Sequence, residues 1–379
     1  MSINNIPDFV GKATWQKIMA YKNNTTEPTP LLLMDPDVIE QKAALIGKQI
    51  KNAQVFYALK ANPDIRLAKM LYEKGMGFEI ASSGELKLVK SFGVDPGKII
   101  TGNTVKPVEF IQQLYAYGVR HFAYDSQDEV KKIARHAPGS KVYIRLSVPN
   151  EGSEWPLSQK FGVEMDEACD LLVLAKENGL EPVGITFHVG SQCTNIYNWD
   201  TAIDKARRLW DMVADRGITL SLLNIGGGYP IDYTKHVADI ETIDRRIDTL
   251  LNDKFPEGVE VFIEPGRGIV GDAGVFMSKV IGKAKRGDEN WLYIDVGVFG
   301  GLIESIGGIK YSYVVESSKA AKKWVVAGPS CDSFDVMDHD VVLPEPELGD
   351  RIFVLGSGAY TTSYASEFNG FAIPKTVIL

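Results

Sequence analysis

The chain has 379 residues, of which 45% are hydrophobic and 24% charged, which indicates a globular protein with room for two domains. Its formal net charge of −8 offers no basic surface, so we expect no nucleic-acid partner. No apolar run is long enough to cross a bilayer and the N-terminus lacks the pattern of a signal peptide, which predicts a cytoplasmic protein with no membrane partner.

Eight short apolar runs alternate with amphipathic segments between about residue 50 and residue 265. The runs are 55–59, 77–80, 98–101, 120–125, 141–147, 183–189, 221–226 and 259–264. Between them, segments such as DEVKKIARHA carry apolar residues at i, i+3 and i+4, which predicts helices. Eight strand–helix units are the number that closes a (β/α)8 TIM barrel, although alternation alone also fits a doubly wound open sheet. We predict the barrel, over residues 30–265.

The pattern changes after residue 266. Strand-like runs at 274–285, 290–297, 323–329, 340–344 and 350–356 are separated by Gly, Pro and Asp turns. Helical periodicity is scarce there, which predicts a C-terminal all-β domain over 266–379. The segment TEPTPLLLMD is expected to add a strand, so residues 1–29 are assigned to the same domain. The predicted fold class is therefore α/β, a (β/α)8 barrel plus an all-β domain.

Polar residues stand at the ends of most of the predicted barrel strands, where barrel enzymes place their chemistry. In chain order they are Lys60, Glu79, Arg145, His188, the glycines 226–228 and Glu264. Each alone has an ordinary explanation, such as a solvated strand end or a structural histidine. Together on one rim they indicate an active site.

Two glycine-rich loops, NIGGGYP and EPGRG, follow the last two predicted strands. Barrels often bind phosphate with these loops, because glycine lets backbone N–H groups approach closely. A phosphate site, a carboxylate and a rim lysine together predict pyridoxal phosphate (PLP), with Lys60 as the covalent anchor of its aldehyde. Glu264 would pair with the pyridine nitrogen and favour its protonated form, which makes the ring a stronger electron sink.

The three cysteines, Cys169, Cys193 and Cys331, are far apart and odd in number. Their spacing argues against a disulfide framework and against a zinc site, so we expect a reducing compartment and no metal. A free cysteine is usually a small buried hydrophobic residue. We interpret Cys169 in that way, and we assign no role to Cys193.

The chain also carries a set of longer motifs in one order, from about residue 56 to 371. They are FYALKANP, FEIASSGEL, WPLSQKFG, FHVGSQ, NIGGGYP, EPGR, GPSCDSFDVM and GAYTTSYASEFNGF. In these motifs the chain resembles the fold-type III PLP-dependent decarboxylases of basic amino acids, especially bacterial ornithine and lysine/ornithine decarboxylases. The resemblance implies decarboxylation of a basic L-amino acid, with ornithine to putrescine as the first expectation and lysine to cadaverine as the second.

The resemblance also implies the residues that hold the cofactor. Lys60 would bond to it, His188 would stack on the pyridine face, and Glu264 would pair with the ring nitrogen. The positions that match phosphate contacts are Ser191, Gly228, Gly266, Arg267 and Tyr360. The positions that match supporting residues around the cofactor are Glu79, Glu85 and Arg145.

The resemblance further implies a homodimer whose active sites form at the interface. On that pattern Cys331 and Asp332 reach into the partner's site, where Cys331 directs protonation at Cα and Asp332 helps to bind the distal amine. Phe368 matches an aromatic wall of the same pocket, and Glu304 is a further candidate for substrate binding.

The stretch DVGVFGGLIESIGGIKYSYV departs from the family pattern. Bacterial relatives tend to follow GLIE with an acidic pair, whereas this chain has Gly307 and Gly308 and is one residue short. A pocket with one carboxylate fewer should bind a cation more weakly, because each charge-assisted hydrogen bond contributes roughly 1.5–3 kcal/mol. Either the substrate is longer or differently substituted, or its distal end is not a free amine, or another acid takes the place of the missing one.

Other functions within and outside the class compete with this expectation. A diaminopimelate decarboxylase would need an Arg-containing set that we do not find, and a racemase would need a second base. A single-barrel PLP carrier is excluded by the C-terminal β-domain. A non-catalytic, decarboxylase-like regulator is the alternative of another class, but such proteins tend to lose the lysine or the cysteine, and both are present here.

Overall fold

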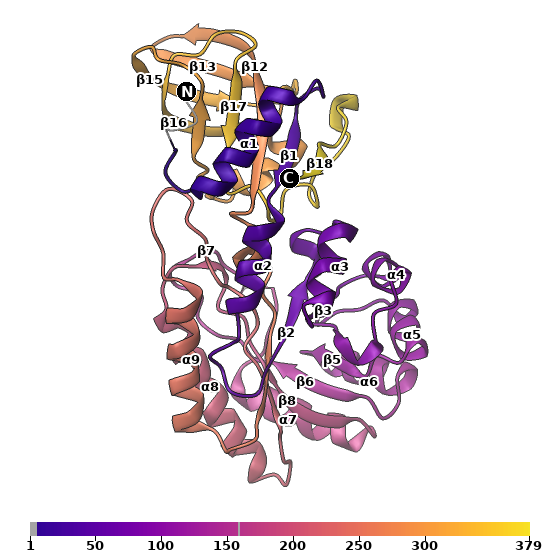
Figure 1. Cartoon of the computed structure of the whole chain (residues 1–379). Coiled ribbons are helices and arrows are strands. Elements are labelled where there is room, and N and C mark those ends of the chain that lie inside the picture. Colours follow the sequence, from indigo (N-terminus) through magenta and orange to yellow (C-terminus); the bar gives the residue numbers. More distant parts are fainter. Residues whose placement is uncertain (1–5, 158–159) are drawn as a thin grey trace. The chain divides into compact units, whose positions relative to one another are not determined.

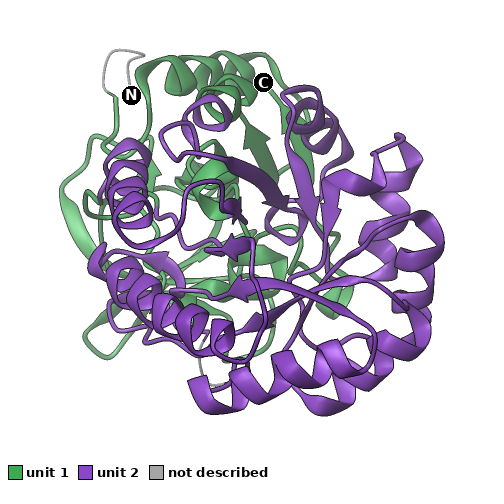
Figure 2. Ribbon diagram, turned by 90° about the horizontal axis from the view of Figure 1, so that it is seen from below, with its two compact units in different colours: residues 1–41, 231–237, 267–379 green, residues 42–230, 238–266 purple. Residues whose placement is uncertain are grey.

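The computed structural model describes residues 6–157 and 160–379, and the chain forms two compact units (Figures 1 and 2). The barrel unit consists of Lys42–Pro230 and Ala238–Gly266. The sheet unit consists of the residues up to Gln41, Ile231–Val237 and Arg267–Leu379. Residues 30–41 and 231–237 therefore lie in the sheet unit, although the predicted barrel over 30–265 included them.

The barrel unit contains a sheet of eight parallel strands. They are β2 (Ala53–Ala58), β3 (Gly77–Glu79), β4 (Ile99–Ile100), β5 (His121–Tyr124), β6 (Lys141–Arg145), β8 (Glu181–Thr186), β10 (Leu222–Asn224) and β11 (Glu260–Ile263). Their order is β4-β3-β2-β11-β10-β8-β6-β5, and a bridge between Thr101 and Phe122 joins the β4 side to β5. Every strand coincides with a predicted apolar run. The ring closes, so the barrel prediction is confirmed and the open sheet is excluded.

Helices surround the strands of the barrel unit, as Figure 2 shows in purple. They are α3 (Ile65–Glu73), α4 (Ser83–Ser91), α5 (Val108–Tyr117), α6 (Gln127–His136), α7 (Met165–Glu177), α8 (Tyr197–Ala214) and α9 (Ile240–Lys254), while α2 (Pro36–Leu45) includes the boundary at Gln41. Asp64, Ser82, Ser126 and Asp239 cap the helices that follow them by accepting a backbone N–H. These caps explain why the helices begin where the sequence predicts.

Side chains from nearly every strand fill the barrel interior. The buried cluster consists of Phe56, Ile100, Ala123, Tyr143, Val183, Leu222 and Phe262. The rings of Phe56 and Phe262, on the neighbouring strands β2 and β11, lie 4.6 Å apart. The interior is a packed core, so chemistry must take place at one of its ends.

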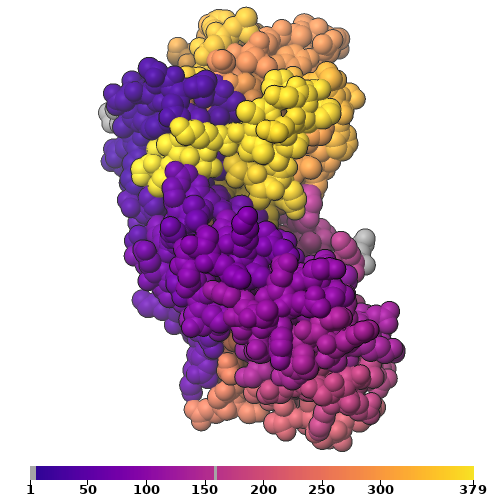
Figure 3. All heavy atoms as spheres, turned by 90° about the vertical axis from the view of Figure 1, so that its right-hand side faces the viewer, coloured from indigo at the N-terminus to yellow at the C-terminus, as the bar shows by residue number. Residues whose placement is uncertain are grey.

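The sheet unit has eight mainly antiparallel strands. They are β1 (Leu31–Met34), β12 (Gly274–Arg286), β13 (Glu289–Ile294), β14 (Tyr313–Val315), β15 (Ala321–Ala327), β16 (Val336–Pro344), β17 (Arg351–Val354) and β18 (Lys375–Ile378). β1 pairs with both β12 and β18, so the predicted N-terminal strand is confirmed. In Figure 3 the indigo N-terminal atoms border the yellow C-terminal ones, as this pairing requires.

Helix α1 (Lys12–Asn24) belongs to the core of the sheet unit. Trp15 and Ile18 are fully buried, and the Trp15 ring lies 5.2 Å from that of Phe353 on β17. The short elements α10 (Arg267–Val270), β7 (Ser153–Trp155) and β9 (Ser191–Cys193) complete the fold. Within the described residues, the helices are too short or too polar to span a bilayer.

Candidate active site

The predicted rim residues all lie at the C-terminal ends of the barrel strands. Glu79 and Arg145 are the last residues of β3 and β6, and Glu264 directly follows β11. His188 stands two residues after β8, and Lys60 lies in a short 3-10 turn, Leu59–Ala61, that follows β2. Because the strands are parallel, these side chains belong to one end of the barrel, the end where barrel enzymes carry their chemistry.

Lys60 forms an ion pair with Glu79. Its ammonium donates a hydrogen bond to Oε2 of Glu79, and the second oxygen of Glu79 accepts the N–H of Gly102 at 3.3 Å. The Glu79 side chain is 2% exposed, whereas that of Lys60 is 48% exposed. The Lys60 side chain is therefore held at the rim by a buried carboxylate and is itself about half exposed.

Glu264 is held by a residue that the sequence analysis did not single out. Asn224, the last residue of β10, donates to Glu264 Oε1 at 2.6 Å and accepts the N–H of Gly226 at 2.9 Å. The N–H of Glu264 in turn donates to the carbonyl of Gly226 at 2.7 Å. Asn224 thus ties the carboxylate to the glycine loop. Asn224 could have been predicted as a site residue, because it is a polar residue at the end of a barrel strand.

Glycine is required at two positions of this loop, because neighbouring atoms lie too close for a Cβ atom. A Cβ on Gly227 would lie 2.5 Å from the Glu264 carbonyl oxygen. Gly228 has a φ of 98°, and a Cβ there would lie 2.7 Å from the Val189 side chain. No side chain can occupy these places, so backbone N–H groups are available beside the rim carboxylate.

Burial dominates the electrostatics of Glu264. Desolvation, followed by the nearby charge of Glu79, raises the pKa of Glu264 from 4.5 to about 7, although Lys60, Asn224 and Arg145 act in the opposite direction. A carboxylate in this state gains from an additional cation opposite it. Burial likewise raises the pKa of Glu85, which accepts the N–H of Ala81 at 2.6 Å at the start of α4.

His188 is a neutral imidazole. Burial, and then the charges of Arg145 and Lys60, lower the pKa of His188 to about 3. Its Nδ1 accepts the N–H of Gly190 at 3.0 Å, so the ring proton lies on Nε2. A neutral, fixed ring of this kind can lie against an aromatic ligand without adding charge.

The remaining phosphate candidates of the barrel unit lie in loops next to the glycine loop. Ser191 begins β9, and two residues later the N–H of Cys193 donates to the carbonyl of Gly228 at 2.9 Å. Gly266 follows Pro265, whose carbonyl accepts the N–H of Ala58 at 2.9 Å. These hydrogen bonds connect β9 to the loop after β10, and β2 to the loop after β11. Ser158 and Gln159 of the WPLSQKFG motif lie outside the described residues.

The donors on this rim fit the group that the sequence predicts. A half-exposed lysine, a neutral ring, a buried carboxylate with a raised pKa and a backbone cradle free of Cβ atoms suit, in that order, the aldehyde, ring face, ring nitrogen and phosphate of PLP.

In the sheet unit, Arg267 and Glu304 form a buried ion pair. The guanidinium donates to the two carboxylate oxygens of Glu304 at 2.7 and 2.8 Å and to the Tyr233 hydroxyl at 2.5 Å. Its carbon lies 4.9 Å from the centroid of the Tyr360 ring. Burial disfavours the charge of Arg267, but Tyr233 and Glu304 outweigh burial and raise its pKa.

This pairing bears on the expectation for Glu304. Its side chain is 4% exposed and both of its oxygens face Arg267. Arg267 thus already contacts both Glu304 oxygens, and the assignment of Glu304 to substrate binding stays a prediction. Arg267 and Tyr360, both matched to phosphate contacts, do lie together.

The substrate candidates Cys331, Asp332 and Phe368 lie close together in the sheet unit. Cys331 and Asp332 are exposed, and Oδ1 of Asn369, the residue after Phe368, accepts hydrogen bonds from Cys331. The Phe368 and Phe299 rings lie 4.4 Å apart. They line, with Ser330 and Phe371 among others, a cavity of about 380 Å³.

The turn at Gly307 and Gly308 supplies no side chain. Both glycines are exposed, and Gly308 has a φ of 108°. The N–H of Gly308 donates to the Ser305 carbonyl at 3.2 Å, and that of Ile309 donates to the Glu304 carbonyl at 3.1 Å. Where the resemblance predicts an acidic pair, the chain therefore forms a tight backbone turn.

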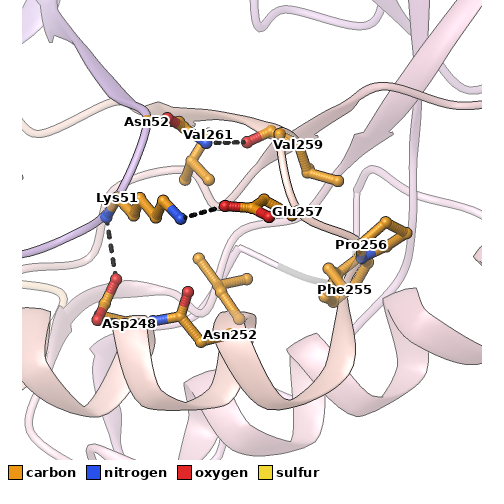
Figure 4. Close-up of a pocket in the computed structure, with 11 residues that line it drawn as sticks. Lys51, Asn52, Asp248, Asn252, Phe255, Pro256, Glu257, Val259 and Val261 are labelled. Atoms are coloured by element: carbon orange, nitrogen blue, oxygen red, sulfur yellow. Dashed lines mark hydrogen bonds and ion pairs between the residues drawn. The ribbon is translucent and has the colours of Figure 1, made fainter.

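A second hollow, of about 240 Å³, lies at the opposite end of the barrel (Figure 4). Lys51 and Asn52 precede β2 there, Val259 precedes β11, and an exposed ion pair of 2.9 Å joins Lys51 to Glu257. The N-terminal end of a barrel serves stability and not catalysis, so we do not assign the chemistry to this hollow.

Comparisons with known proteins agree with this arrangement. A family model described as "Pyridoxal-dependent decarboxylase, pyridoxal binding domain" matches residues 37–271. A lysine/ornithine decarboxylase of Selenomonas ruminantium is 36% identical, over 93% of this chain and 90% of that protein.

Solved structures are similar as well. The lysine/ornithine decarboxylase of Vibrio vulnificus, complexed with putrescine, has a TM-score of 0.87 at 33% identity and covers 96% of this chain and 97% of that one. SrLDC, in complex with PLP and cadaverine, has a TM-score of 0.88 at 34% identity and covers 96% and 93%.

Proposed function

We propose that this chain, which belongs to the family of pyridoxal-dependent decarboxylases, removes the α-carboxyl group of a basic L-amino acid, ornithine or lysine. The enzyme class and the PLP cofactor follow from the family. The substrate is proposed from lysine/ornithine decarboxylases whose similarity covers 93% and 96% of this chain. The observation that carries the proposal is the half-exposed Lys60 side chain, held by buried Glu79 on the same barrel rim as Glu264.

We assign the cofactor contacts from the motifs that resemble this family. Lys60 would bond to the aldehyde, His188 would lie against the ring, and Glu264 would face the ring nitrogen. The phosphate contacts are Ser191, Gly228, Gly266, Arg267 and Tyr360. Glu79, Glu85 and Arg145 support this set. When bound, PLP accepts the electron pair that remains at Cα after carbon dioxide leaves.

The chain itself supplies orientation and charge. Asn224 fixes the Glu264 carboxylate by a hydrogen bond. The raised pKa of Glu264 shows that burial makes its negative charge costly. A cationic ring nitrogen opposite Glu264 relieves that cost and keeps both groups charged. His188 stays neutral and contributes contact without competing for the negative charge.

The substrate side of the proposal needs a second copy of the chain. We assign to Cys331 the proton that Cα receives and to Asp332 the distal ammonium, each acting in the partner's site of a homodimer. Both are exposed, and so are the nearby Phe334 and Phe371, at 57% and 46%. Exposed aromatic side chains around polar ones are typical of a surface that a partner covers. The three free cysteines are compatible with the cytoplasm.

A second candidate substrate is a basic amino acid whose distal end is modified. It is favoured by one observation, that Glu304 is engaged by Arg267 and the Gly307–Gly308 turn offers no carboxylate. Asp332 is then the acid left among those matched to the distal amine. A substrate without a free distal ammonium would lose less binding free energy when one carboxylate is missing from the pocket.

The test is carbon dioxide release by the PLP-loaded protein from ornithine, lysine, arginine and diaminopimelate. Release from ornithine or lysine supports the first candidate. Bound PLP with no release from any of the four would favour the modified substrate. A protein that binds no PLP and forms no amine would act as a regulator and not as an enzyme.

A further inference from the structure

The Cys331 thiol has a specific hydrogen-bond partner. Oδ1 of Asn369 accepts the backbone N–H of Cys331 at 3.1 Å and the Sγ–H at 3.3 Å. The two residues are 38 positions apart and come from the GPSCDSFDVM and SEFNGF segments. One carboxamide oxygen therefore fixes both the backbone and the side chain of this exposed cysteine.

The backbone at Asn369 is shaped for this contact. Its φ is 55°, the left-handed region, inside the short turn Phe368–Gly370. Asparagine and aspartate adopt this conformation more readily than other residues with a side chain. The cysteine loop is fixed from its other side as well, because Oδ2 of Asp335 accepts the N–H of Ser330 at 2.9 Å.

The chemistry of the acceptor decides the orientation of the thiol. A carboxamide oxygen has no proton to give, so the thiol must donate, and its S–H bond points at Oδ1. The contact therefore limits the rotation of the thiol and fixes the direction of its S–H bond.

We infer that Asn369 is a positioning residue that orients the Cys331 thiol for delivery of its proton to Cα; this inference rests on the proposed function. In that step the S–H bond breaks and a C–H bond forms at Cα, where the electron pair of the departed carboxylate is available. The thiolate then regains a proton from water. When the proton is instead added on the cofactor side, hydrolysis releases an aldehyde and the amino group stays on the cofactor.

Two variants of the PLP-loaded enzyme separate this role from a structural one. Asn369→Gly removes the carboxamide and tolerates the left-handed backbone, whereas Asn369→Asp keeps an acceptor oxygen in place and adds a negative charge. Ser333→Ala, in the same exposed loop, is the matched control.

The first measurement is the rate of iodoacetamide alkylation of Cys331, which can be followed because Cys169 and Cys193 are buried. A hydrogen bond of about 1 kcal/mol corresponds to about 5-fold, so Asn369→Gly should react about 5-fold faster than the wild type. Asn369→Asp should react more slowly, because its carboxylate opposes the thiolate. If Asn369 only supported the loop, the two substitutions would not change the alkylation rate of Cys331 in opposite directions.

The second measurement is the fraction of aldehyde among the products. It should rise in Asn369→Gly and stay near the wild-type value in Asn369→Asp and Ser333→Ala. Wild-type alkylation rates in both Asn369 variants would overturn the inference, and so would an unchanged aldehyde fraction in Asn369→Gly while carbon dioxide is released normally. A wild-type enzyme that releases no carbon dioxide would instead refute the proposed function.

Discussion

The substitution Glu264→Gln should make the cofactor-free protein more stable at alkaline pH. Burial and Glu79 raise the pKa of Glu264 from 4.5 to about 7. Between these two pH values the folded protein holds a proton that the unfolded chain has released, so the free energy of unfolding falls as pH rises. At 1.36 kcal/mol per pH unit, the ionised carboxylate costs the folded state up to about 3 kcal/mol above pH 7.

Glutamine removes this cost and still offers an oxygen to Asn224. Urea titrations of the cofactor-free proteins, at equal protein concentration, should give similar unfolding free energies near pH 5. At pH 8.5 the variant should be the more stable by up to about 3 kcal/mol. The control Glu260→Gln, at an exposed position on β11, should change stability by less than about 0.5 kcal/mol at both pH values. Equal differences at pH 5 and pH 8.5, or a wild type that is the more stable at pH 8.5, would show that Glu264 is not destabilised by burial.

Three further changes test the assignments. Lys60→Ala should lose carbon dioxide release and the borohydride-stable attachment of PLP, and normal turnover of this variant would refute the anchor. Gly307→Asp restores an acid near the distal end and should lower the KM for ornithine about 10-fold, since a charge-assisted hydrogen bond contributes about 1.5–3 kcal/mol; an unchanged KM would place the distal amine elsewhere. Glu304→Gln leaves Arg267 buried without a counter-charge, so it should destabilise the protein by about 3 kcal/mol and weaken PLP binding measured by fluorescence. If Glu304→Gln instead raised only the KM for ornithine, Glu304 would be assigned to substrate binding.

The barrel could be predicted from sequence because its signals are local. Each apolar run is short, each following helix is amphipathic, and caps such as Ser82 and Asp239 mark where helices begin. The rim residues follow from the same pattern, since a polar residue at the end of a buried parallel strand must lie at one end of the barrel.

The boundaries of the two units could not be read in this way. Residues 231–237 follow a barrel loop in sequence, yet the Tyr233 hydroxyl accepts from Arg267 and the Tyr233 carbonyl accepts from Ser312. Likewise β1 pairs with β12, so the chain up to Gln41 belongs to the sheet. Such long-range hydrogen bonds leave no periodic signal.

The same reason explains the incomplete picture of the site. The pairing of Glu304 with Arg267 could not be predicted, because the two residues lie 37 positions apart and meet only in the folded chain. Asn369 gave no signal, because its contact with Cys331 depends on a left-handed turn.

The most direct test of the central claim measures decarboxylation and the site of PLP attachment in the same preparation. The purified protein is loaded with PLP, assayed for carbon dioxide release from ornithine and lysine, and then reduced with borohydride and digested for mass spectrometry. We predict release from at least one of the two substrates, with the reduced cofactor on the peptide that contains Lys60. Attachment at another lysine, or an absence of release from a protein that carries PLP on Lys60, would contradict the proposal.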